Sequence, residues 1–347
     1  KASPANTHVI RHAGKILTLE EAHLPWIVNE NLDTIDSYDF DGKLDGPMTA
    51  HPRVCPETGE LLFFGYQMMK KPYLTYHRVS KEGVLVQSEE IDIPRPVMMH
   101  DWNITRNYVV FMDLPLVFDI NDAVSGSDPF GFKPECGARL GVMPRNGSNS
   151  DIKWIDINPC FVFHPMNAYE EDDKIILHVC RQNKAMVGGM DEIYGGEDST
   201  GKLWKWTIDL TSGECSEEQI DDRPCDFARI DDRLVGLKAK NGYTMALDEK
   251  AETLTFDQYL YKFDLENNKR IDHDLGSNVF GGEPIFVPKF DNSSENDGWV
   301  MAIVYDANIS KSKLIIVDTE NFDKKPISEI ILPQRVPFGA HGSWLSN

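Results

Sequence analysis

The chain has 347 residues, enough for one large buried core. Acidic residues outnumber basic ones by 56 to 35, which gives a formal net charge of -21. This balance argues against a nucleic-acid partner, because the phosphate groups of nucleic acids are bound by clusters of Lys and Arg. No apolar run approaches the roughly 20 residues that a membrane-spanning helix requires.

The six cysteines are far apart in the sequence and form no CxxC pair. Such spacing predicts neither a disulfide framework nor a structural zinc site. We therefore expect a reducing, intracellular setting, and a cytoplasmic location with or without attachment to a membrane.

Short β-rich runs separated by turn residues follow one another along the chain, with little helical periodicity. The clearest runs cover residues 61–66, 108–112, 174–179 and 299–305. Clusters of Pro, Gly, Asn and Asp punctuate them, as turn chemistry requires. This pattern predicts an all-β fold, and we expect a single domain over residues 1–347.

A strand that ends in a polar reversal recurs six times along the chain. The last residues of these six segments are Asn29, Ser80, Pro144, Asp209, Asp264 and Asp318. Successive members of this set are 51, 64, 65, 55 and 54 residues apart. Four-stranded propeller blades repeat at about 40 to 50 residues, so the spacing predicts blades with modest loops.

Six residues share one position in this repeat, 17 to 23 places after each reversal, where the next strand begins. They are His51, His100, His164, Asp226, Glu283 and His341. The innermost strand of each blade lines the channel of a propeller. A common register in successive blades therefore predicts four imidazoles and two carboxylates around one axis.

Four neutral imidazoles suit a divalent metal such as iron. Asp226 and Glu283 are then candidates for the carboxylates that orient such ligands. Zinc is the chemical alternative, but it usually takes three or four ligands in tetrahedral geometry. The remaining histidines lie outside the register and are expected to be hydrogen-bonded structural residues: His8, His12, His23, His77, His178 and His273.

Five segments resemble the motifs of the carotenoid cleavage oxygenase family. Thr-Ala-His-Pro at 49–52 resembles the first metal-ligand motif. Met-His-Asp-Trp-Asn-Ile-Thr-Arg-Asn-Tyr at 99–108 and Phe-His-Pro-Met-Asn-Ala-Tyr-Glu at 163–170 are similar to the second and third. Pro-Phe-Gly-Ala-His-Gly at 337–342 resembles the fourth, and Gly-Gly-Glu-Pro-Ile-Phe-Val-Pro at 281–288 is also similar. The five motifs occur in the family's order and cover nearly the whole chain.

The resemblance implies a seven-bladed β-propeller with one iron(II) per chain on its axis and no catalytic residue beyond the metal centre. The ligands that it implies are His51, His100, His164 and His341. By motif, three carboxylates that support the histidines fall on Glu21, Asp226 and Glu283.

Two features depart from the family pattern. Asp226 stands where the family usually has Glu, and the loss of one methylene is expected to lengthen its hydrogen bond or to require a water. The chain also contains six repeat units where seven are implied, so we expect about one blade and an N-terminal segment to be missing from it.

The activity that the resemblance implies is cleavage of a conjugated carbon–carbon double bond by dioxygen, which gives two carbonyl products. An apolar tunnel would position an elongated lipophilic alkene at the metal. Residues 114–118 and 129–132 are candidates for this tunnel or for a membrane contact at its mouth. Ordinary packing at a blade edge is the equally expected alternative.

The choice of substrate within the family depends on one position. Stilbene-cleaving members carry a lysine directly before the first supporting glutamate, whereas this chain has Glu20. A carboxylate is a poor partner for a phenolate, so an apocarotenoid is favoured over a stilbene. An isomerase that uses the same iron is a further alternative. A non-catalytic propeller that binds a partner or a lipophilic ligand is another, although such a scaffold has no need for four imidazoles in one register.

Overall fold

The computed structural model describes residues 3–185, 199–248, 250 and 255–345. Its regular structure is almost entirely β-strand, and the single α-helix among these residues is the six-residue α1 (Ile120–Ser125). Within the described part of the chain, no helix has the length and apolar character to cross a bilayer. Two compact units are formed, one by Lys1–Pro159 with Ala340–Asn347 and the other by Cys160–Gly339. The single domain expected over residues 1–347 stays a prediction.

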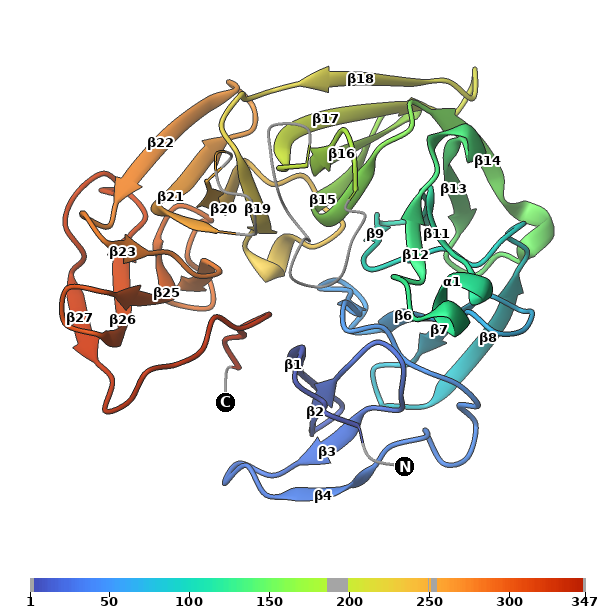
Figure 1. The fold of residues 1–347 in the computed structure, drawn as a ribbon, viewed down its shortest axis with the longest axis horizontal. Helices are drawn as coiled ribbons and strands as arrows, with labels where there is room; N and C mark the ends of the chain where they lie inside the picture. The colour runs from blue at the N-terminus through green and yellow to red at the C-terminus, as the bar shows by residue number, and fades with distance from the viewer. Residues whose placement is uncertain (1–2, 186–198, 249, 251–254, 346–347) are drawn as a thin grey trace. The chain divides into compact units, whose positions relative to one another are not determined.

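The first unit contains three four-stranded antiparallel sheets, drawn in blue to green in Figure 1. Sheet one is β1 (His8–His12), β2 (Lys15–Leu19), β3 (Trp26–Val28) and β4 (Thr34–Ser37). Sheet two is β5 (Arg53–Val54), β6 (Leu61–Tyr66), β7 (Leu74–Val79) and β8 (Leu85–Ile91). Sheet three is β9 (Asn103–Ile104), β10 (Tyr108–Asp113), β13 (Ala138–Pro144) and β14 (Lys153–Ile157).

The connection between β10 and β13 carries an additional hairpin. Its strands are β11 (Leu116–Phe118) and β12 (Phe130–Phe132), and α1 lies between them in the sequence. Two short 3-10 helices flank β13: η1 (Pro134–Cys136) and η2 (Asn149–Asp151).

The second unit also contains three antiparallel sheets, and η4 (Asp232–Leu234) lies between β19 and β20. Sheet four is β15 (Phe161–Glu171), β16 (Lys174–Gln182), β17 (Lys202–Asp209) and β18 (Cys215–Gln219). Sheet five is β19 (Cys225–Arg229), β20 (Asn241–Leu247), β21 (Phe256–Asp264) and β22 (Lys269–Asp274). Sheet six is β23 (Val279–Phe280), β24 (Ile285–Pro288), β25 (Gly298–Asp306), β26 (Lys311–Asp318) and β27 (Ser328–Ile331).

Each sheet is a propeller blade, and in sheets one to five the strands lie side by side in chain order, whereas in sheet six β23 and β24 both pair with β25. The six reversals of the sequence repeat lie at or directly after the ends of the third strands, β3, β7, β13, β17, β21 and β26. A fourth strand then leads to the start of the next sheet, which explains the similar offset of the candidate site residues from each reversal. The predicted all-β propeller class and the six repeat units are confirmed.

Neighbouring sheets within each unit pack through apolar faces. In the first unit, Leu19 of β2 and Phe63 of β6 belong to one buried cluster. In the second unit, Tyr243 of β20 and Val300 of β25 belong to another. Second strands supply much of this core: all seven residues of β20 are buried. The first strands of sheets two and three, β5 and β9, are only two residues long.

Histidines inside these layers are kept neutral. The ring nitrogens of His178 in β16 are buried and have no hydrogen-bond partner among the described residues. Burial, with a smaller contribution from the charge of Lys205, lowers the pKa of His178 to about 4. Burial alone lowers the pKa of His77 in β7 to about 4 as well, and its Nδ1 lies 2.9 Å from Ser88 Oγ. His77 is thus the hydrogen-bonded structural residue that was expected, whereas the expected hydrogen bond of His178 is wrong: this ring is buried without a hydrogen-bond partner in the described part of the chain.

The depressed pKa of His178 predicts a loss of stability in mild acid. Between its folded pKa of about 4 and its unfolded value of about 6.5, the unfolded chain binds the proton and the folded chain does not, so the free energy of unfolding falls as the pH is lowered through this window. From pH 7 to pH 5, His178→Phe is expected to lose on the order of 2 kcal/mol less of that free energy than the unmodified protein. Urea unfolding at the two pH values measures the difference, and equal losses would contradict the assignment.

Candidate metal centre

Three of the four predicted ligand histidines lie in the first unit. His51 lies two residues before the short strand β5, and His100 lies three residues before β9. His341 belongs to the C-terminal segment, which is hydrogen-bonded to β1 and the residue before it. The His341 amide donates to Thr7 O at 2.9 Å, and Ser343 Oγ donates to Val9 O at 2.6 Å. Through these two hydrogen bonds, His341, near the end of the sequence, lies beside the start of β1, near its beginning.

The three imidazoles face one another. One nitrogen from each of His51, His100 and His341 lies within 4.8 Å of the corresponding atoms of the other two. The Nε2 atoms of His51 and His100 are 3.0 Å apart. Two nitrogens bound at right angles to one ion, each about 2.1 Å from it, would be separated by about 3.0 Å. The donor set therefore fits a divalent metal, with room for further ligands.

A carboxylate with a partly buried side chain orients His100. Glu21, just after β2, contacts His100 Nδ1 through one oxygen, and the Tyr66 hydroxyl at the end of β6 donates to the other. Burial opposes ionisation of Glu21, but His100, Tyr66 and His341 outweigh it and hold its pKa below the ordinary value. Burial and the neighbouring Glu21 charge raise the pKa of Tyr66 far above its usual range, so it remains a donor. A charged Glu21 keeps the proton of His100 on Nδ1 and leaves Nε2 for a metal.

His51 also has a carboxylate beside its Nδ1. Asp101 Oδ2 lies 3.5 Å from that nitrogen, and Asp101 Oδ1 accepts from Arg53 Nη2 at 2.6 Å. This aspartate directly follows His100 in the second motif, but nothing in the sequence alone marks it as a partner of His51. Tyr66 was also missed, since it is one of eleven tyrosines and stands in no motif.

In the second unit, His164 and Asp226 form a buried pair. His164 Nδ1 lies 2.8 Å from Asp226 Oδ1, an ordinary hydrogen-bond distance. The expected lengthening by the shorter side chain is therefore wrong. Strand pairing slips across His164 in β15, again directly after Pro165, and between Asp226 and Arg229 in β19, and Phe227 has a φ of 55°. Such bulges re-aim side chains and allow Asp226 to reach the imidazole directly.

Glu283 lies between β23 and β24, directly after two glycines. Its side chain is buried, and Oε1 is 3.4 Å from Arg229 Nη1. A Cβ on Gly282 would lie only 2.2 Å from the carbonyl oxygen of Ile303, so a larger residue would displace this segment. The glycine is required by a close approach to β25, and it sets the backbone from which Glu283 projects.

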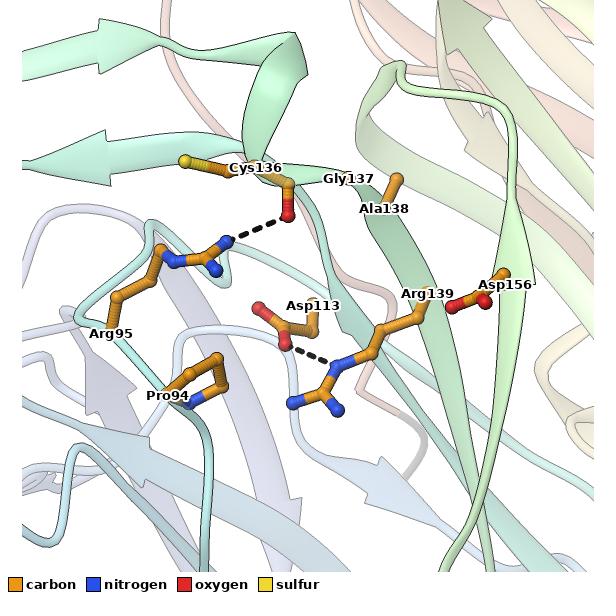
Figure 2. Close-up of a pocket in the computed structure, with 8 residues that line it drawn as sticks. All are labelled: Pro94, Arg95, Asp113, Cys136, Gly137, Ala138, Arg139 and Asp156. Atoms are coloured by element: carbon orange, nitrogen blue, oxygen red, sulfur yellow. Dashed lines mark hydrogen bonds and ion pairs between the residues drawn. The ribbon is translucent and has the colours of Figure 1, made fainter.

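A separate cavity of about 180 Å³ lies elsewhere in the first unit (Figure 2). In Figure 2, Arg95 reaches the Cys136 carbonyl and Arg139 reaches Asp113, at 2.9 and 2.8 Å respectively. None of the predicted site residues lines this cavity. The candidate metal centre is therefore a different part of this unit.

Comparison with known proteins places the chain in a family. A family model described as retinal pigment epithelial membrane protein matches residues 1–346. Carotenoid 9,10(9',10')-cleavage dioxygenase 1 of Phaseolus vulgaris is 34% identical over 98% of this chain. The chain spans about two thirds, 66%, of the length of that relative.

Solved structures agree. The crystal structure of Pseudomonas brassicacearum lignostilbene dioxygenase has a TM-score of 0.89 and 30% identity, over 99% of this chain and 76% of the other. Cobalt-substituted apocarotenoid oxygenase from Synechocystis has a TM-score of 0.87 and 27% identity, over 99% of this chain and 74% of the other. These matches agree with the repeated blades and with the clustered histidines and their carboxylates. The chain therefore belongs to the carotenoid cleavage oxygenase family, which the retinal pigment epithelial membrane protein model represents.

Proposed function

We propose that this chain carries the metal centre of a non-heme iron(II) dioxygenase, which cleaves a conjugated double bond of an apocarotenoid into two aldehydes. The observation that carries the proposal is the set of facing imidazoles in the first unit, with His51 Nε2 and His100 Nε2 3.0 Å apart. A purely structural role would not require imidazole nitrogens to face one another at this distance.

The proposed ligands are His51, His100, His164 and His341. The first, second and fourth are the facing histidines of the first unit. His164 is assigned from its motif, its position in the repeat, and the contact of its Nδ1 with Asp226, which parallels the contact of His100 with Glu21. Iron(II) held by four neutral imidazoles supplies the binding and activation of dioxygen.

The supporting carboxylates keep protons in place on the histidine rings and do not transfer protons in the reaction. Glu21 and Asp226 keep the Nδ1 protons of His100 and His164 in place, which frees each Nε2. We assign Glu283 the same role toward a third ligand, as its motif implies. No residue of the chain acts as a general acid or base, and the site selects the cleaved bond by positioning the substrate.

Glu20 favours an apocarotenoid over a phenolic stilbene. Its carboxylate is turned onto His23, with Glu20 Oε2 2.6 Å from His23 Nδ1, and it also accepts the Ala22 amide at 3.1 Å. A carboxylate held in this way offers no cation to a substrate phenolate. Both substrate classes occur among the names of similar proteins, lignostilbene for one and apocarotenoid for another.

We assign helix α1, which connects β11 and β12, to contact with an apolar surface, such as the membrane from which a lipophilic substrate is taken. Leu116 and Val117 are buried, so this part of the hairpin packs internally. The exposed apolar side chains lie on the adjoining helix α1, where Val124 is 81% and Ile120 is 42% exposed.

Incubation with substrate tests the proposed reaction. Iron-loaded protein with an apocarotenal and oxygen is expected to give two aldehydes by mass spectrometry, and His164→Ala is expected to lower the rate by at least about 100-fold because it removes a ligand. His273→Asn is a matched control, since His273 is equally buried and its contact of 2.8 Å with the Phe322 carbonyl can be made by an amide. Cleavage of a hydroxystilbene alone would overturn the substrate assignment, and cleavage of neither compound would overturn the function.

The role of Glu21 predicts a change in metal affinity. Glu21→Gln keeps the size of the side chain but removes the charge that orients His100, so affinity for Fe²⁺ is expected to fall about 10- to 100-fold. Equilibrium dialysis with metal analysis measures this change. Glu20→Gln is the control, because Glu20 contacts His23 rather than His100. Equal affinities of the two variants would show that Glu21 does not support a metal ligand.

A further inference from the structure

The carboxylate of Asp101 is buried between a cation and a proposed metal ligand. Its Oδ1 accepts from Arg53 Nη2 at 2.6 Å and from the Trp102 amide at 2.7 Å. Its Oδ2 faces His51 Nδ1 at 3.5 Å. The side chain of Asp101 is only 3% exposed, so these groups, rather than water, determine its orientation.

The same residues fix the backbone around His51. Trp102 Nε1 donates to the His51 carbonyl at 2.9 Å, and Arg53 Nη2 donates to the Trp102 carbonyl at 3.0 Å. Trp102 is fully buried against Phe64 and Phe111. The starts of β5 and β9 are thus tied together, and Asp101 has little freedom to turn away from the imidazole.

The two carboxylates beside the facing histidines differ in their surroundings. Glu21 contacts His100 closely, and its other partner from a side chain is the neutral hydroxyl of Tyr66. Asp101 is farther from His51 and is shared with the guanidinium of Arg53. A carboxylate at Nδ1 strengthens Nε2 as a donor to a metal, whereas a cation on that carboxylate weakens the effect.

We propose that Asp101 is a positioning residue for His51 and that Arg53 limits the strength of its action. This inference rests on the proposed function, because it concerns how the chain's own residues prepare a metal ligand. Asp101 holds the His51 proton on Nδ1 and directs Nε2 toward the metal. Arg53 compensates the buried charge of Asp101 in the metal-free protein and leaves His51 a weaker donor than His100.

Two substitutions have opposite expected effects. In Asp101→Asn, the two donors on Oδ1 retain the amide oxygen, so the amide NH₂ group faces His51 Nδ1. That contact favours the tautomer with the proton on Nε2, which blocks metal binding. In Arg53→Gln, Asp101 loses its cation, and a bound metal compensates the buried carboxylate through His51 instead, so metal binding becomes more favourable.

Titration with Co²⁺ tests the proposal, with the Kd and the visible absorption of the bound ion as readouts. Asp101→Asn is expected to raise the Kd about 10- to 100-fold and to shift the Co²⁺ bands, and Arg53→Gln is expected to lower the Kd about fivefold. Asp113→Asn is the matched control, because Asp113 forms another buried pair with an arginine, at 2.8 Å from Arg139, beside the cavity in Figure 2.

Urea unfolding in the presence of a chelator measures stability separately from metal affinity. We expect the free energy of unfolding to fall in both Asp101→Asn and Asp113→Asn. Unchanged Co²⁺ binding in Asp101→Asn, equal losses of affinity in Asp113→Asn, or weaker binding in Arg53→Gln would overturn the proposal while leaving the metal centre intact. Failure of the unmodified protein to bind Co²⁺ would overturn the proposed function and this inference together.

Discussion

An imidazole binds a metal only through a nitrogen that carries no proton, so the candidate centre depends on where the histidine protons lie. In His100 and His164, a carboxylate at Nδ1 determines the position of that proton. Tyr66 supports Glu21 in turn, and the charges and donors around Glu21 keep it ionised despite its burial. The candidate centre therefore depends on these acid–histidine pairs.

The blade architecture provides positions at which such acid–histidine pairs can form in an interior with little water. Second strands, such as β20, fill the apolar layers, while His51 and His100 precede strands of only two residues, β5 and β9. Where a longer first strand carries the residue, as β15 carries His164, irregular pairing turns the side chain out of the regular ladder. His178, inside a layer, shows the opposite outcome: burial without a partner lowers its pKa to about 4 and keeps it neutral.

Glu21 and Asp101, the carboxylates beside the facing histidines of the first unit, are not equivalent. They differ in the side chain that each contacts besides its histidine. A neutral tyrosine beside Glu21 leaves its negative charge for His100, whereas Arg53 draws the charge of Asp101 away from His51. Two ligands of one metal would then differ in basicity although their side chains are identical. Such asymmetry is a means by which a four-histidine site can tune its ion without a change of ligands.

The sequence by itself determined the all-β class, the six repeats and the shared position of His51, His100, His164 and His341, because strand length and turn chemistry are local properties that recur with the blade. Its motifs also indicated Glu21, Asp226 and Glu283. Only the tertiary structure decided which acid meets which histidine, since Glu21 and His100 are far apart in sequence and belong to different sheets. Asp101, Arg53 and Tyr66 became visible only there. Their roles depend on distances between neighbouring blades and on burial, and a pattern along one chain does not specify either quantity.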